Sequence, residues 1–132
     1  MNYFSAFTPS SLYSHKENYL RYLDSRQWQE VKRSYWLSNR PNECWACGKK
    51  YEYKSQGFNF HHLTYKNLYR ERPEDLMLLC SNHHRELELS WKSRTTSSIS
   101  LEAFSYAFIC ASRMEQGVSF KPLMKYFKGL ID

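Results

Sequence analysis

Two short pairs of metal-ligand residues constrain this chain more than any other feature of its sequence. Cys44-Trp-Ala-Cys47 is a C-x2-C pair, and Cys80-Ser-Asn-His83 is a C-x2-H pair that follows much later in the chain. Each pair can present two ligands from one tight turn, and four such ligands fit a tetrahedral zinc site. The alternative is that these are scattered thiols and one surface histidine. We favour zinc, which would tie two distant segments together.

Histidines gather beside these pairs. Of the five histidines in the chain, four form the doublets His61-His62 and His83-His84. Neighbouring side chains on a strand face opposite sides, so the members of a doublet can serve different purposes. Glu88 lies four residues after His84, which places both on one face of a helix and suits a shared divalent ion. A solvated charge is the alternative for Glu88.

Composition limits the classes of protein that remain. A chain of 132 residues suits one compact domain, and a net charge of +6 favours a polyanionic partner such as nucleic acid. No apolar run is long enough to span a membrane, and the N-terminus lacks the pattern of a signal peptide, so we expect a cytoplasmic protein. The four cysteines are then metal ligands or buried thiols rather than disulfides. Cys110 has no partner spacing, and we expect it in the core.

Periodicity and capping residues predict a mixed helical and strand structure. We expect a polar N-terminal arm, a cysteine-containing turn and short hairpin over residues 43–60, and a strand that runs through Phe58 and Phe60 into the first histidine doublet. Ser25 and Ser100 are expected to begin helices, and Gly117 to end one. The expected helices cover residues 13–22, 26–39, 82–91, 101–115 and 121–130.

The same patterns predict which side chains are buried. In the second helix these are Trp28, Val31 and Tyr35, with Trp36 as a further candidate. In the two C-terminal helices, the side chains expected to face inward are those of Leu101, Phe104, Ala107, Phe108, Ala111, Leu123, Met124, Phe127 and Leu130.

The stretch HHLTYKNLYRERPEDLMLLCSNHH, residues 61–84, closely resembles the core of the HNH endonucleases, in particular their zinc-containing branch. Residues 19–28 and the sequence from Cys44 to Gly48 also resemble that branch, so the resemblance covers about residues 19–90. It implies an α+β fold: a small ββα-metal HNH core with a structural zinc, flanked by N-terminal and C-terminal helices. The whole chain, 1–132, would be one domain with an arm (1–18), the core (19–90) and a C-terminal helical extension (91–132).

The resemblance also implies roles for individual residues. His62 would be the general base that activates a water, and His61 and His84 would hold a catalytic ion. Asp75 stands where the family usually has Asn and would orient His62, although its carboxylate could also draw a metal. Glu88 stands where some members have a further histidine ligand. The structural zinc would be held by Cys44, Cys47, Cys80 and His83, with His83 in place of the more usual cysteine.

The expected function is therefore metal-dependent hydrolysis of DNA, with Zn²⁺ as structural ion and Mg²⁺, Mn²⁺, Ni²⁺, Co²⁺ or Zn²⁺ as catalytic ion. DNA is the expected partner, with no membrane and no small-molecule substrate. Phosphate contacts would come from Lys66, Arg70, Arg72 and Arg85, for which solvated loop charges are an equal alternative.

Two other functions fit the same residues. One is a zinc-stabilised nucleic-acid-binding module without catalysis, and the other is a toxin-like nuclease held by a protein inhibitor. The aromatic C-terminal third is either additional core, which is the interpretation we favour, or a surface for a protein partner. Small stand-alone HNH proteins are frequent in phages and prophages, which is the setting that the resemblance implies.

Overall fold

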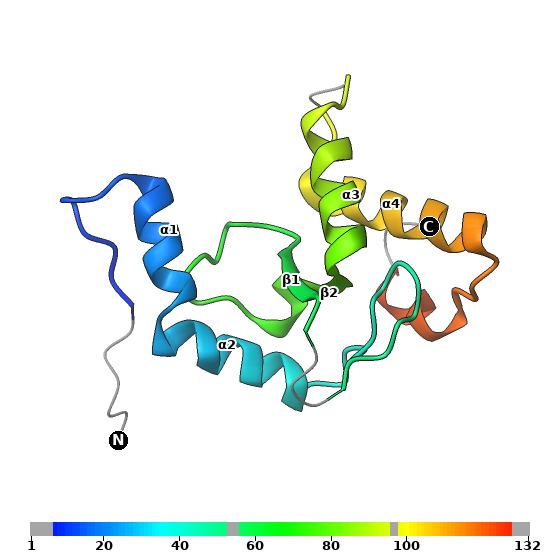
Figure 1. Ribbon diagram of the computed structural model, residues 1–132, viewed down its shortest axis with the longest axis horizontal. Helices are drawn as coiled ribbons and strands as arrows, with labels where there is room; N and C mark the ends of the chain where they lie inside the picture. Colours follow the sequence, from blue (N-terminus) through cyan, green and yellow to red (C-terminus); the bar gives the residue numbers. More distant parts are fainter. Residues whose placement is uncertain (1–6, 53–55, 96–97, 128–132) are drawn as a thin grey trace. The chain divides into compact units, whose positions relative to one another are not determined.

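The computed structural model describes residues 7–52, 56–95 and 98–127 (Figure 1), and its contacts divide the chain into two compact units. The first unit combines Met1–Arg40 with Tyr65–Leu76, and the second combines Pro41–Thr64 with Met77–Asp132. Each unit is therefore assembled from two separate stretches of the sequence. The two are described one after the other below.

The first unit is built on two capped helices. Ser14 and Glu17 form a capping box at the start of the first helix, and the Ser25 hydroxyl accepts a hydrogen bond from Trp28 N at the start of the second. The predicted cap at Ser25 is thus confirmed, and such caps stabilise a helix by about 1 kcal/mol. The elements of this unit are α1 (His15–Leu23), α2 (Arg26–Leu37) and the 3-10 helix η1 (Pro73–Asp75).

Aromatic side chains form the core of the first unit. Tyr22 is fully buried, and its ring lies 5.6 Å from that of Trp28 and 4.9 Å from that of Tyr69. Its hydroxyl donates a hydrogen bond to the buried carboxylate of Glu71. Burial of Trp28, Val31 and Tyr35 was predicted and is confirmed. Tyr69 reaches its place with a φ of 76°, a left-handed conformation that a bulky residue rarely adopts.

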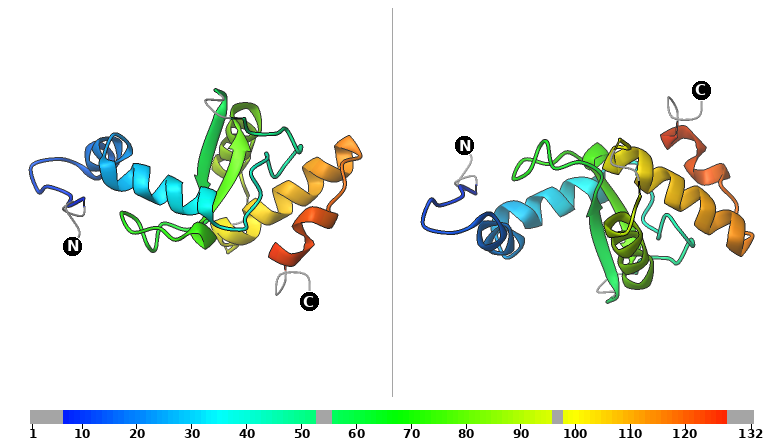
Figure 2. Two further views of the ribbon diagram at one scale, coloured as in Figure 1. Left: turned by 90° about the horizontal axis from the view of Figure 1, so that it is seen from below. Right: turned by 90° about the horizontal axis from the view of Figure 1, so that it is seen from above.

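The second unit contains a small antiparallel sheet followed directly by a helix. Strand β1 (Phe58–His62) pairs with strand β2 (Leu76–Cys80), and Ser81 N donates to Gly57 O just beyond their ends. Helix α3 (Ser81–Lys92) begins at the residue after β2 and packs against β1 (Figure 2). Every residue of β2 is buried, as its unbroken apolar sequence LMLLC requires. The predicted strand into His61 and His62 is confirmed.

A long helix, α4 (Leu101–Gln116), packs against α3 and completes this unit. The Ser100 hydroxyl accepts a hydrogen bond from Ala103 N at its start, and Gly117 ends it with a φ of 69°. The start of the helix at Ser100 and its end at Gly117 were both predicted, and both are confirmed. The chain then forms the short 3-10 helix η2 (Lys121–Tyr126) rather than the helix expected over residues 121–130, whose last residues lie outside the described part of the chain.

Several expected details of the second unit are wrong. The buried face of α4 does not include Ala107 or Ala111, which are exposed, and Met124 is half-exposed instead of facing inward. Cys110 is only half-buried. In the region expected to form a turn and a short hairpin, Glu43 and Lys50 form an antiparallel bridge across the cysteine turn, whereas β1 pairs with β2.

Candidate metal centres

A tight turn presents the first pair of cysteines. Cys44 N donates to Lys49 O and Gly48 N donates to Cys44 O, both at 2.8 Å, so the chain closes around residues 44–49. Gly48 has a φ of 76°, which only glycine adopts without strain. Trp45 N donates to Leu78 O of β2 and thereby fixes the turn beside the sheet.

The second pair lies where β2 meets α3, and the two pairs come together. Cys80 is the last residue of β2, and His83 lies in the first turn of α3. The His83 Nδ1 atom lies 3.2 Å from Cys80 Sγ and 4.0 Å from Cys44 Sγ. One ligand atom from each of Cys44, Cys47, Cys80 and His83 lies within 4.8 Å of all the others. This cluster could bind a metal ion, and three sulfurs with one imidazole are a donor set that zinc prefers.

The environment of the cysteines fits that donor set. Burial raises the pKa of the Cys44 thiol to about 12, against backbone hydrogen bonds that act in the opposite direction. A cation that binds there must therefore displace the thiol proton, which a soft divalent ion such as zinc does. The tight turn, the end of β2 and the start of α3 carry the four side chains.

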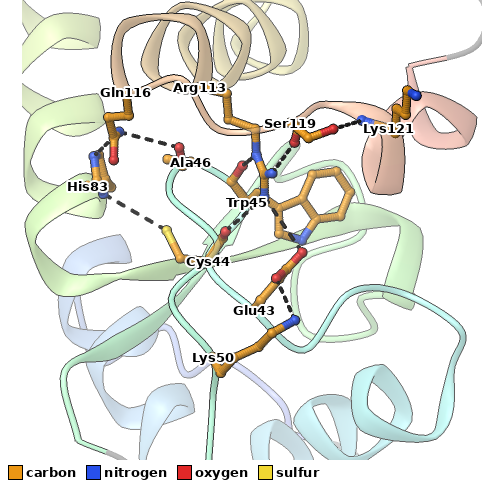
Figure 3. Close-up of polar contacts among 10 residues, drawn as sticks. All are labelled: Glu43, Cys44, Trp45, Ala46, Lys50, His83, Arg113, Gln116, Ser119 and Lys121. Atoms are coloured by element: carbon orange, nitrogen blue, oxygen red, sulfur yellow. Dashed lines mark hydrogen bonds and ion pairs between the residues drawn. The ribbon is translucent and has the colours of Figure 1, made fainter.

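Helix α4, which follows both ligand pairs in the sequence, supports the cysteine turn. Arg113 is 2 % exposed, and its guanidinium donates to Trp45 O, to Cys44 O at 3.3 Å and to Ser119 O (Figure 3). It also lies 3.7 Å from a carboxylate oxygen of Glu43. One buried side chain therefore bonds three backbone carbonyls, two in the cysteine turn and one just after α4, and these bonds supply partners for its own buried donors.

A second side chain of α4 reaches the histidine of the cluster. Gln116 Nε2 lies 3.3 Å from His83 Nε2, on the side of the ring opposite the sulfurs, and within reach of Ala46 O (Figure 3). With Nδ1 facing the thiols, His83 Nε2 is the nitrogen that would carry the proton. The same amide nitrogen donates to Ser112 O at 3.1 Å, so Gln116 joins the end of α4 to the turn and lies against the His83 ring.

A second, separate cluster lies between β1 and α3. His61 comes from β1, and His84 and Glu88 stand one turn apart on α3. Glu88 Oε1 lies 3.7 Å from His61 Nδ1 and 3.4 Å from His84 Nε2. The three ligand atoms lie within 4.8 Å of one another, so this cluster could also hold a cation. The structure thus brings together the three residues expected to hold a catalytic ion.

The surroundings of His84 and Glu88 lower the pKa of both groups. Burial lowers the pKa of His84, and the nearby rings of His61 and His62 lower it further, although Glu88 opposes this. The polar contact with His61 is the main cause of a lowered pKa at Glu88, with the charge of His84 adding to it. His61 Nδ1 is buried without a hydrogen-bond partner, which suits an atom that donates its electron pair to a cation.

The predicted general base and its partner lie in different units. His62 is 2 % exposed and close enough to His84 to influence its charge. Asp75, in the first unit, accepts hydrogen bonds from Asn67 Nδ2 at 3.0 Å and from Arg72 N at 2.9 Å. Its role in orienting His62 stays a prediction.

The residues expected to contact phosphate are all exposed. Lys66, Arg70 and Arg72 belong to the first unit, and Arg85 lies on α3 of the second. Arg72 also forms ion pairs with Glu74 and Asp75.

Sequence reasoning missed the contribution of α4 to both clusters. Ser105, Arg113 and Gln116 each touch a ligand residue or the cysteine turn. One signal was available: Ser105, Ser112 and Gln116 are spaced by seven and four residues, which places polar side chains on one face of a helix.

Comparison with known proteins gives no relative: no family model, curated protein or solved structure matches the chain significantly. Within the described residues, the helices are too short or too polar to cross a lipid bilayer.

Proposed function

We propose that the protein is a metal-dependent endonuclease of the HNH type, which hydrolyses DNA phosphodiester bonds. The observation that carries the proposal is the convergence of His61, His84 and Glu88, at contacts of 3.7 and 3.4 Å. The order β1–β2–α3 supports it, because a ββα-metal core needs two strands and a following helix around one ion. The sequence from residue 61 to residue 84, which resembles that family, covers those same elements.

The cysteine cluster has a structural role in this proposal. It joins the turn around Cys44 to the start of α3, the helix that carries His84 and Glu88. Four protein ligands leave no open position, which is typical of structural rather than catalytic zinc. Zinc would therefore fix the position of α3 relative to the sheet that carries His61 and His62.

The chain's own side chains supply the remaining chemistry. A divalent ion at the His61 cluster would stabilise the negative charge that builds up on the scissile phosphate and on the departing oxygen. His62, on the neighbouring position of β1, would take the proton of the attacking water. Because His62 is buried, this role requires that the side chains over it move when DNA binds.

The donor set narrows the choice of ion. Two imidazole nitrogens favour Mn²⁺, Co²⁺, Ni²⁺ or Zn²⁺, and the Glu88 carboxylate adds a hard oxygen that makes Mg²⁺ with bound waters acceptable. Lys66, Arg70, Arg72 and Arg85 would neutralise DNA phosphates, which gives affinity without base preference.

Cleavage of a supercoiled plasmid tests the proposal. The zinc-loaded protein is incubated with Mg²⁺, Mn²⁺ or Ni²⁺, with and without EDTA, alongside His62→Ala and a control at the exposed His15, His15→Ala. We expect nicking that needs the ion, survives in the control and is lost in His62→Ala. Failure of the wild type to nick with any ion would contradict the proposal.

The principal alternative is a zinc-stabilised module that binds nucleic acid without cleaving it. The cysteine cluster and the net charge of +6 fit this function equally well. DNA binding measured by fluorescence anisotropy at several salt concentrations separates the two, because phosphate contacts make affinity fall as salt rises. Salt-dependent binding without ion-dependent nicking would favour the module. Binding that persists in His62→Ala while nicking is lost would favour the enzyme.

A further inference from the structure

The hydroxyl of Ser105, on α4, makes a buried contact with a proposed ligand of the catalytic ion. Ser105 Oγ lies 2.8 Å from His61 Nε2, and both side chains are at most 1 % exposed. The same hydroxyl donates its hydrogen to Leu101 O, one turn earlier in the helix, at 2.7 Å. A serine hydroxyl has one hydrogen to donate and two lone pairs with which to accept. Its oxygen is therefore an acceptor toward His61.

This assignment decides where the proton of His61 lies. If Ser105 Oγ accepts from His61 Nε2, that nitrogen carries the hydrogen and Nδ1 carries the free electron pair. His61 Nδ1 is the nitrogen that lies 3.7 Å from Glu88 Oε1, and it is buried without a hydrogen-bond partner. Its lone pair thus points into the cluster that includes His84. The contact with Ser105 thus decides the tautomer, and a cation held between Nδ1 and Glu88 would relieve the repulsion between that lone pair and the carboxylate.

We infer that Ser105 is a positioning residue, which holds His61 in the Nε2–H tautomer and so presents Nδ1 to a divalent cation. The role of that cation in cleavage rests on the proposed function, whereas the tautomer does not. Ser105 lies outside residues 19–90, the part of the chain that resembles the nuclease family. The C-terminal extension therefore completes the cation site instead of only enlarging the core.

Nuclear magnetic resonance measures the tautomer directly. Long-range ¹H–¹⁵N correlation spectra of the zinc-loaded protein, without other divalent ions, distinguish a protonated from an unprotonated ring nitrogen in His61. We expect Nε2 to be protonated and Nδ1 unprotonated in the wild type. A proton on Nδ1 in the wild type overturns the inference, and this measurement needs no variant that could fail to fold.

A matched pair of variants on one helix tests the role of the hydroxyl. Ser105→Ala should lose the single tautomer, while Ser112→Ala, the same change at another buried serine of α4, should keep it. Calorimetric titration of the zinc-loaded protein with Mn²⁺ should show binding about 10- to 100-fold weaker for Ser105→Ala only, as is usual when an outer partner of a histidine ligand is removed. Unchanged tautomer and Mn²⁺ affinity in Ser105→Ala would overturn the inference.

The two proposals can fail separately. A wild type that shows the Nε2–H tautomer and binds Mn²⁺ through His61, but never nicks DNA, supports this inference and contradicts the endonuclease. A wild type that nicks DNA with its His61 proton on Nδ1 does the reverse.

Discussion

The buried guanidinium of Arg113, on α4, donates a hydrogen bond to the backbone carbonyl of Trp45 in the cysteine turn. This contact joins the C-terminal third of the chain to the cluster formed by the two cysteine/histidine pairs. It explains why a charged residue lies on the inner face of an otherwise moderately apolar helix. The contribution of Arg113 to the free energy of unfolding can be measured.

Arg113→Met should destabilise the zinc-loaded protein by about 3–5 kcal/mol, because Glu43 and the backbone carbonyls of the turn lose a buried charged partner. Urea unfolding followed by tryptophan fluorescence measures this free energy. The matched control is Arg33→Met at an exposed site on α2, which should change stability by no more than about 0.5 kcal/mol. Equal effects of the two changes would contradict a supporting role for Arg113.

The cysteine cluster predicts one tightly bound zinc per chain. Cys47→Ser should abolish zinc retention through gel filtration, because the cluster then offers only three good ligands. Cys110→Ser changes a half-buried cysteine that is outside the cluster and should keep the ion. Metal content by mass spectrometry checks both. Zinc that stays bound in Cys47→Ser, or is lost from Cys110→Ser, would show that the ligands have been assigned incorrectly.

The sequence predicted the parts of the sites that depend on local spacing. A C-x2-C turn, a strand into His61 and a helix that begins near His83 all follow from neighbouring residues. Which strand pairs with β1 depends on contacts made far along the chain, so residues 43–60 alone could not predict that β1 pairs with β2.

The inner face of α4 was also mispredicted, for a different reason. Hydrophobic periodicity selects apolar side chains, but Ser105, Ser112 and Arg113 are buried on this helix. Arg113 is tolerated there because its donors find carbonyl partners in a turn that lies far away in the sequence. Hydrogen bonds between a buried polar side chain and distant parts of the chain cannot be deduced from the sequence of the helix alone.

The lowered pKa of Asp75 predicts that the stability of the protein depends on pH in the acid range. Burial alone would raise its pKa, but hydrogen bonds from Arg72 N and Asn67 and the charge of Arg72 outweigh this, so the pKa lies below its usual value. The folded state therefore holds the carboxylate more firmly than the unfolded state does. Its stabilisation is fully present above the unfolded pKa and is lost as the pH falls through the folded pKa.

Asp75→Asn should accordingly cost about 1.5–3 kcal/mol near pH 7, the usual contribution of hydrogen bonds to a charged group. The difference from the wild type should begin to shrink below about pH 4, where the unfolded carboxyl takes up a proton, and should disappear only as the pH falls through the lower pKa of the folded state. Urea unfolding at a series of pH values from 3 to 7 measures both. A difference that stays constant over this range would exclude the carboxylate as its source.

Glu88→Gln should alter the preference for ions, because it keeps the shape of the side chain and removes the hard, charged oxygen. We expect the affinity for Mg²⁺ and Mn²⁺ to fall at least about tenfold, and that for Ni²⁺ to fall less, since Ni²⁺ relies more on the two imidazoles. Titration calorimetry of the zinc-loaded protein measures these affinities. Glu86→Gln, at an exposed position two residues earlier on α3, is the control. Equal losses for all ions would argue against direct coordination by Glu88.

The most direct test of the account is the rate of plasmid nicking by the zinc-loaded protein as a function of Mn²⁺ concentration, for the wild type and for His84→Ala. The account predicts a saturable rise in the wild type and, in the variant, a rate at least about 100-fold lower with zinc content unchanged, because the ion loses an imidazole ligand. Nicking by the variant at the wild-type rate, or wild-type nicking that is indifferent to Mn²⁺ and EDTA, would contradict it.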